Sequence, residues 1–304
     1  MYSFSTCWNS HRHSDGRAML REIRSLGFEW AELSHGIRLS LLPGIFEAVE
    51  AGEIKISSLH NFCPLPMGIT HAAPNLYLFS SLDPRERDNA YKHSLKTIET
   101  AARLKAGVVV LHLGCIDMKE YTTKLLEMVE RGQGKTAKYL DLCETVREKR
   151  EKKKERYAEF SSEMVARLAL PAEARGIKLA IENRHAVEEL PLDSDMEVLL
   201  REFDRPGIGY WHDCGHAQIK ENLGFIEHRM FLECLAPRLL GFHVHDVAFP
   251  GHDHRAPGTG MIDFAALKPM VKPEHIKVFE LSPGLTLDEA ARGVAHIREV
   301  WGDA

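Results

Sequence analysis

Residues 209–216, Gly-Tyr-Trp-His-Asp-Cys-Gly-His, place a short apolar approach directly before an aspartate and, three residues later, a histidine. The approach predicts a buried strand, and Gly215 lets the chain turn sharply after it. An Asp-x-x-His sequence alone is common in ordinary loops, so its meaning depends on what the other strands bring to the same end of the sheet. If they bring further ligand-type side chains, Asp213 and His216 belong to a site.

This stretch is one of several β-rich runs that alternate with segments able to hold a helix. The runs are Tyr2–Thr6, Trp30–Ser34, Ile54–His60, Val108–Leu113, Lys178–Asn183, Ile208–Asp213, Leu239–Asp246 and Ile276–Ser282. Eight strand-helix repeats in 304 residues favour an α/β fold closed as a (β/α)8 TIM barrel over an open doubly wound sheet. No Gly-x-Gly-x-x-Gly follows the first run, so a dinucleotide fold loses its main support. We expect a single domain over residues 1–304.

Helix boundaries are marked by capping residues. Asp15 predicts the N-cap of a first helix that ends at Gly27, and Asp83-Pro84 predicts the start of another that ends before Gly107.

Residues 116–176 are longer than an ordinary connection and predict an extra helical insertion between strands 4 and 5. The sequence Gly132-Gln133-Gly134 predicts a break within it. Residues 147–156 mix both charges, which predicts a solvated helix face with i,i+4 pairs; an anion-binding or nucleic-acid-binding face is the alternative.

Composition indicates a globular protein that acts on a small ligand. The formal net charge is -5, which disfavours nucleic-acid binding over the molecule as a whole, and 44% hydrophobic residues can fill a large core. The six cysteines form no Cys-x-x-Cys pair, and no signal peptide or apolar run long enough to span a membrane is present. We therefore expect a cytoplasmic protein with no membrane association.

Side-chain alternation along the strands predicts which residues face the inside of the barrel. Apolar residues that suit the helix-facing side alternate with polar residues that would point inward at the strand ends, where barrel active sites lie. The inward residues are His60, His112, Glu182, Asp213, His243, His245 and Glu280. One such group is ordinary, but convergence of so many on one rim predicts a site. Glu32, at the end of the second run, is placed to reach the same rim.

Carboxylates together with an imidazole make an oxygen-rich site with a nitrogen ligand. That donor set suits Mn²⁺, Mg²⁺, Co²⁺, Fe²⁺ or Zn²⁺ and does not choose among them. The sequence therefore predicts a divalent metal whose identity is open.

These motifs resemble those of the xylose isomerase-like TIM barrels, a family that holds sugar isomerases and epimerases, inosose dehydratases and endonuclease IV. The matching segments are Ala180-Ile181-Glu182-Asn183, Asp213-Cys214-Gly215-His216, His243-Val244-His245-Asp246 and Val278-Phe279-Glu280. The resemblance spans almost the whole chain and implies a metal held by Glu182, Asp213, His243 and Glu280. It also implies that the chain can form a homo-oligomer.

The endonuclease IV branch adds histidines that bind two further zinc ions. His60 and His112 stand where that branch has them, and residues 252–260 resemble its Asp-x-His-x-x-x-Gly-x-Gly segment, although His252 replaces the aspartate. The resemblance thus leaves His60, His112, His216, His252 and His254 as further metal ligands or as groups that bind substrate hydroxyls.

The chemistry that suits such a site is proton transfer at a carbon next to a carbonyl, which needs a base, an acid and a cation. We expect a metal-dependent isomerase or epimerase of a sugar or sugar derivative, with Glu182 and Glu280 as the catalytic acid–base pair and Arg184 among the residues that orient substrate oxygens. The alternatives are a keto-sugar lyase or dehydratase, an endonuclease IV-like phosphodiesterase with several zinc ions, and a barrel that binds a ligand without turnover.

Other histidines show no spacing that groups them, and we expect surface or helix positions for them. They are His11, His13, His71, His93, His228, His275 and His296.

Overall fold

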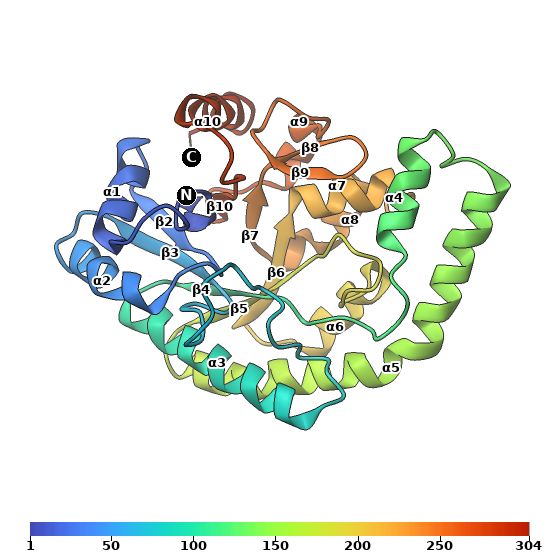
Figure 1. Ribbon diagram of the computed structural model, residues 1–304, viewed down its shortest axis with the longest axis horizontal. Helices are drawn as coiled ribbons and strands as arrows, with labels where there is room; N and C mark the ends of the chain where they lie inside the picture. The colour runs from blue at the N-terminus through green and yellow to red at the C-terminus, as the bar shows by residue number, and fades with distance from the viewer. Residues whose placement is uncertain (304) are drawn as a thin grey trace.

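Parallel strands close into a barrel in the computed structural model, which describes residues 1–303 (Figure 1). The strands are β1 Tyr2–Ser5, β2 Trp30–Leu33, β3 Lys55–His60, β4 Val108–Leu111, β5 Lys178–Glu182, β6 Ile208–Asp213, β7 Leu239–Val244 and β10 Ile276–Phe279. Neighbours around the barrel follow chain order, and β10 pairs with β1 to close it. Each predicted run contains one barrel strand, although Leu239–Asp246 also reaches the first residue of a further strand, and the predicted (β/α)8 TIM barrel is confirmed.

Helices surround this barrel (Figure 1). They are α1 Gly16–Ser25, α2 Leu42–Glu50, α3 Pro84–Arg103, α4 Thr122–Glu130, α5 Ala137–Glu173, α6 Met196–Glu202, α7 Cys214–Asn222, α8 His228–Leu235, α9 Phe264–Leu267 and α10 Leu287–Trp301. Short 3-10 helices are Thr6–Trp8, Leu39–Leu41, Asp193–Asp195, Ala236–Arg238 and Lys268–Met270. The predicted caps are confirmed: the side chains of Asp15 and Asp83 accept hydrogen bonds from the first turns of α1 and α3.

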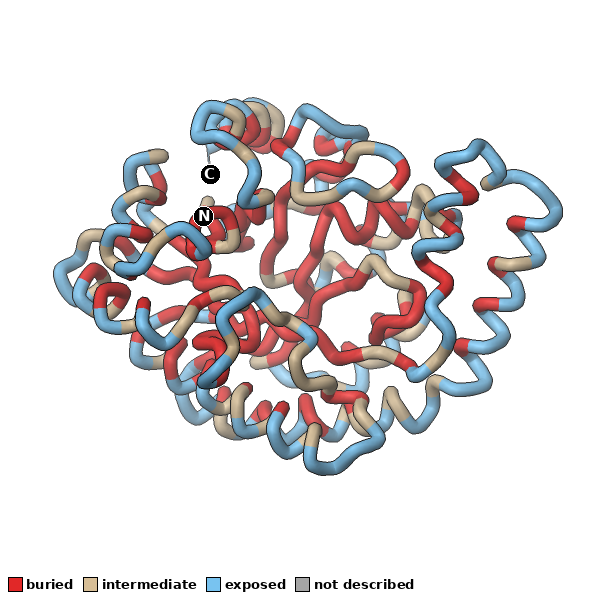
Figure 2. The backbone as a smooth tube through the Cα atoms, viewed as in Figure 1, coloured by how far each residue is buried: buried red, intermediate tan, exposed pale blue. Residues whose placement is uncertain are grey.

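The predicted insertion between β4 and β5 consists of α4 and the long α5, and residues 132–134 lie in the break between them. Along α5 the predicted pairs form, for example Lys152 with Glu148 at i,i+4. Arg150 departs from the predicted solvated face, because its side chain is buried and its guanidinium lies over the ring of Phe225. The helix therefore packs along one stripe and is solvated along the rest (Figure 2).

Two separate apolar clusters lie on the two faces of the strands. The helix-facing cluster contains Leu179, Ile181, Phe242, Val244 and Phe279, as the alternation predicts. The cluster inside the barrel consists of Val108, Val110, Ala180, Trp211, Ile276 and Val278. Val110, Ala180, Trp211 and Val278 each precede an inward polar residue of the same strand by two positions. The apolar cluster therefore forms the floor beneath the polar strand ends.

A short antiparallel hairpin, β8 Asp246–Ala248 with β9 His252–Arg255, follows β7 and was not predicted. Its second strand, His-Asp-His-Arg, has no apolar alternation that could signal a strand. The hairpin is formed instead by the pairing of Asp246 with Arg255 and of Ala248 with His252.

The two ends of the described chain meet at the closure of the barrel (Figure 1). The Tyr2 hydroxyl donates a hydrogen bond of 2.7 Å to the carbonyl of Gly302, which follows α10. Among residues 1–303, no helix is both long enough and apolar enough to cross a bilayer.

Candidate active site

Four strand ends bring together three carboxylates and an imidazole. Glu182 ends β5, Asp213 ends β6, His243 lies in β7 and Glu280 follows β10, and one ligand atom from each lies within 4.8 Å of the others. All four side chains are buried. The structure thus places the predicted metal ligands around one point.

His243 is the centre of this group. Its Nδ1 lies 2.7 Å from Glu182 Oε1, 3.2 Å from Glu280 Oε2 and 3.8 Å from an oxygen of Asp213. Its Nε2 faces the other way, 3.2 and 3.3 Å from the two carboxylate oxygens of Glu32. Glu32 is fully buried and also accepts a hydrogen bond from the hydroxyl of Ser58. A carboxylate behind a histidine fixes the ring and directs its other nitrogen toward a ligand.

The charges of the group are interdependent. Burial raises the pKa of Glu182, but His243 and His112 outweigh it, so that pKa lies well below its usual range. Burial likewise raises the pKa of Glu280, but His243 and a hydrogen bond from His254 bring it well below. Burial lowers the pKa of His243, yet the carboxylates around it, Glu280 first, raise it well above its usual value. The buried carboxylates need a positive charge among them, which a proton on His243 or a divalent cation can supply.

Asp213 is held by two histidines of the following segments. His245 Nε2 lies 3.0 Å from Asp213 Oδ1, and His216 Nδ1 lies 3.5 Å from Oδ2. Asp213 also caps α7, because its carboxylate accepts from the backbone N–H of His216 at 2.7 Å. At Gly215 an added Cβ would lie 2.0 Å from His245 Cε1, so only glycine allows this close approach.

A second group shares Glu182. His60 Nε2 and His112 Nε2 lie 3.1 Å apart, and they lie 3.4 and 2.6 Å from Glu182 Oε2. The guanidinium of Arg184 lies against the same atoms, with Nη1 2.7 Å from His112 Nε2 and 3.2 Å from Glu182 Oε2. Burial and the adjacent Arg184 lower the pKa of His112 to about 3.

A third group lies beside these two, with His216 Nδ1 4.0 Å from Glu182 Oε1. His185, His216 and Asp253 could each offer one ligand atom within 4.8 Å of the others. His216 donates through Nδ1 to the carbonyl of Asn183 at 3.0 Å, which leaves Nε2 for a ligand.

His252 is not brought to the site. Its side chain is exposed, while Asp253 and His254 face the cavity. In a regular strand His252 and His254 would share a face, but His254 has a φ of 54° and this breaks the alternation. The resemblance led us to expect an acidic residue at position 252. The structure has one at the next position instead, Asp253, which lines the cavity. The ring of His254 stacks on His245 at 4.3 Å and its Nε2 lies 3.8 Å from Glu280.

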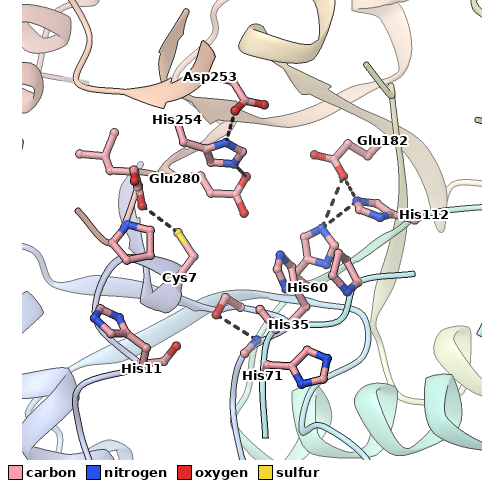
Figure 3. Close-up of a pocket in the computed structure, with 18 of the residues that line it drawn as sticks. Cys7, His11, His35, His60, His71, His112, Glu182, Asp253, His254 and Glu280 are labelled. Carbon is pink, nitrogen blue, oxygen red and sulfur yellow. Dashed lines mark hydrogen bonds and ion pairs between the residues drawn. The ribbon is translucent and has the colours of Figure 1, made fainter. Parts of the chain in front are cut away.

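These groups line a cavity with a volume of about 500 Å³, which lies within the range of small-molecule sites, roughly 300–1,000 Å³. Figure 3 shows Glu182, His112 and His60 on one side, Glu280 and His254 on another, and His11 and His71 at the far end. Glu182 and Glu280 line the cavity, whereas Asp213 and His243 lie behind them.

Several residues of the site escaped the sequence reasoning. His35, Arg38, His185 and Asp253 line the cavity, and so do His11 and His71, which we expected at ordinary surface positions. Asp253 lies in β9, which was not predicted, and the others lie in loops, so neither strand parity nor helical spacing gave a signal. Of the other histidines expected at the surface or on helices, His228 begins α8 and is buried there, whereas His275 is buried outside a helix.

A closed parallel barrel with a polar cluster at the carboxyl ends of its strands is typical of (β/α)8 proteins with strand-end sites. The chain belongs to the xylose isomerase-like TIM barrel family, whose sequence model matches residues 20–299.

Solved structures of this fold resemble the chain over nearly its full length. A D-tagatose 3-epimerase-like protein superposes with a TM-score of 0.71 at 17% identity, covering 98% of this chain and 96% of that one. A 3-keto-D-glucoside 4-epimerase from E. coli gives a TM-score of 0.68 at 14% identity, covering 98% of both chains. The IOLI protein, solved with a bound zinc atom, gives 0.64 at 16% identity, covering 99% of this chain and 97% of that one. No curated protein sequence matches the chain.

Proposed function

We propose that this protein is a metal-dependent epimerase or isomerase of a sugar or sugar derivative, acting by proton transfer next to the carbonyl of a ketose or keto-sugar. The observation that carries the proposal is the position of two glutamates. Glu182 and Glu280 come from separate strands, contact the same histidine and are the two members of the four-residue group that line the cavity. Two carboxylates on different sides of one substrate suit removal and return of a proton.

The donor set fits a divalent cation. Three buried carboxylates around the Nδ1 of His243 would repel one another strongly without a cation between them. Glu182, Asp213, His243 and Glu280 would hold the ion, and the mixture of oxygen and nitrogen suits Mn²⁺, Mg²⁺, Co²⁺, Fe²⁺ or Zn²⁺. When bound, such an ion would polarise the substrate carbonyl and stabilise the negative charge that develops on its oxygen.

The chain's own residues would move the proton. One glutamate removes the proton from the carbon beside the carbonyl, and the protonated form of the other delivers a proton to the opposite face, which inverts that carbon. Delivery to the former carbonyl carbon instead, with transfer of the hydroxyl proton of the first carbon to the former carbonyl oxygen, would isomerise the sugar. Arg184 would orient substrate oxygens from a fixed position, because Glu189 and Glu182 hold its guanidinium at 3.1 and 3.2 Å. His60, His112 and His216 would bind neighbouring hydroxyls, and His254 lies at the same wall.

Deuterium wash-in from heavy water tests this mechanism. Glu182→Gln and Glu280→Gln, with metal content verified by elemental analysis, should each lower exchange at the substrate carbon by about 10²–10⁴-fold across a panel of ketoses and keto-glycosides. Glu274→Gln, an exposed residue outside the cavity, is the matched control and should exchange as the wild type does. Wild-type exchange in both glutamate variants with metal bound would contradict the mechanism.

A second candidate is a phosphodiesterase with two or three zinc ions. The groups His60–His112–Glu182 and His185–His216–Asp253 favour it, because each could hold a further ion beside the first. Counting metal in the purified protein separates the candidates. One ion per chain supports proton transfer, and two or three support hydrolysis. A keto-sugar lyase would share the first proton removal and would be recognised by its unsaturated product.

A further inference from the structure

The cavity has two chemically different ends. The acidic lining residues Glu182, Glu280 and Asp253 all lie at the inner end, by the candidate metal site. Ser10, His11, Arg38, Thr70 and His71 line the outer end, which the loops after β1, β2 and β3 form. Figure 3 shows His11 and His71 across the cavity from Glu182 and Asp253. A substrate that reacts at the inner end would therefore extend toward basic residues.

Arg38 is the fixed positive charge of this outer end. Its Nη2 donates to the backbone carbonyls of Ser10, at 3.3 Å, and of His13, which hold the side chain in place. Its Nε is buried and has no hydrogen-bond partner. Among residues 1–303, no carboxylate forms an ion pair with Arg38.

His35 lies between the two ends. Its ring meets that of His60 edge to face, with centroids 4.8 Å apart, and its buried Nδ1 also lacks a partner. Buried polar atoms are nearly always hydrogen-bonded, so unpartnered nitrogens in two residues that line the cavity point to a ligand that completes this wall.

We infer that the substrate carries an anionic group, a phosphate or a carboxylate, at the end away from the reacting carbons, and that Arg38 binds it with His11 and His71. The inference rests on the proposed function, because that function determines which end of the cavity holds the reacting carbons. A ligand that covers Arg38 removes water from a full positive charge, which is unfavourable unless the ligand brings a negative charge. Guanidinium groups bind phosphate and carboxylate oxygens through paired N–H donors, and the two imidazoles add donors beside them.

Isothermal titration calorimetry tests this with three sugars that differ at one end: D-fructose, D-fructose 6-phosphate and D-fructuronate. The metal-loaded wild type should bind at least one anionic sugar about tenfold or more tighter than fructose, and Arg38→Met should weaken that sugar about 10–100-fold while changing fructose less than about threefold. Tighter binding of D-fructose 6-phosphate identifies the group as a phosphate, and tighter binding of D-fructuronate identifies it as a carboxylate. Arg12→Met is the matched control, because Arg12 also donates to this segment, at the Trp8 carbonyl, but does not line the cavity.

A double variant, His11→Gln with His71→Gln, guards against misfolding of Arg38→Met, since both histidines are exposed. It should weaken the anionic sugar by about three- to tenfold and leave fructose unchanged. Equal affinity for the three sugars, a preference that survives Arg38→Met, or no binding of any of them overturns the inference.

Deuterium wash-in on the same samples separates this inference from the proposed function. Proton exchange without a preference for anionic sugars would support the proposed function and contradict the inference of an anionic group. A preference for anionic sugars that depends on Arg38, without proton exchange in any sugar, would support the anion-binding site and contradict the proton-transfer mechanism.

Discussion

At the scale of single residues, the Glu32–His243 pair determines how the candidate metal site is oriented. Glu32 accepts from His243 Nε2, so Nδ1 is the nitrogen that faces Glu182 and Glu280. A neutral or absent partner at position 32 would leave the ring free to rotate or to change tautomer. Residues behind a ligating histidine commonly matter for metal affinity almost as much as the ligands do.

We therefore expect Glu32→Gln and Glu32→Leu to weaken binding of Mn²⁺ or Zn²⁺ by about 10–100-fold, as measured by calorimetric titration against a competing chelator. Glu29→Gln, an exposed glutamate just before β2, should bind metal as the wild type does. Unchanged affinity in a folded Glu32→Leu protein would show that the pair does not position His243.

At the scale of elements, one aspartate organises the loop that carries Asp253 and His254 to the cavity. The carboxylate of Asp246 accepts from the backbone N–H groups of Val247, Gly258, Gly260 and Ile262, at 2.9 to 3.1 Å. Gly260 is required there, because an added Cβ would lie 2.4 Å from Asp246 Oδ1. The hairpin β8–β9 is thus built around a polar centre.

Asp246→Ala should lower the free energy of unfolding by about 2–5 kcal/mol, since it leaves two buried and two partly buried N–H groups without an acceptor. Urea denaturation measures this loss, and hydrogen exchange should rise across residues 247–262. Asp263→Ala is the control: it removes only the cap of α9, where one N–H is accepted, and should cost about 1 kcal/mol. Equal losses in the two variants would argue against the central role of Asp246.

At the scale of the whole molecule, a buried histidine pair joins the barrel to its outer helices. His212, on β6, points away from the barrel interior, and its Nε2 lies 2.9 Å from Nε2 of His228 on α8. Burial lowers the pKa of His228 to about 4 and that of His212 well below its usual value. The Nε2 atoms of His212 and His228 share one hydrogen, so a proton on both Nε2 atoms would leave them no acceptor and is disfavoured.

The sign of the pH effect follows from that lowered pKa. The unfolded chain takes up a proton at His228 near pH 6.5, but the folded chain does so only near pH 4. The contribution of the neutral His228 to the free energy of unfolding is therefore fully present above pH 6.5 and is lost as the pH falls toward 4. This residue should account for a loss of about 3 kcal/mol over that window. Urea unfolding at several pH values should show a shallower dependence for His228→Gln than for His296→Gln, a half-buried control on α10. Parallel curves for the wild type and His228→Gln would contradict the assignment.

The barrel also bears on domain organisation. Residues from both ends of the chain contribute to its closure through β1 and β10, and α10 returns to Tyr2. That residues 1–304 form one domain stays a prediction, and a single cooperative unfolding transition would support it.

The sequence predicts the site residues on strands better than those in loops. Strand periodicity predicted the eight barrel strands and the inward position of Glu182, Asp213, His243 and Glu280, because the alternation of side chains is a local property of the backbone. The resemblance to the endonuclease IV segment, not periodicity, suggested His252, and the structure leaves His252 exposed and brings Asp253 to the cavity instead. Periodicity missed Arg38, His11 and His71, since loops carry no periodic pattern.

The sequence by itself determined the barrel, the caps of its helices and the set of side chains at the strand ends, because these depend on periodicity and capping within short segments. Only the tertiary structure decided that Glu32 lies behind His243, that Arg184 lies against His112, and that basic loop residues line the outer end of the cavity. Those contacts join residues from different loops and strands. Their geometry depends on how the barrel closes, which no short segment of sequence encodes.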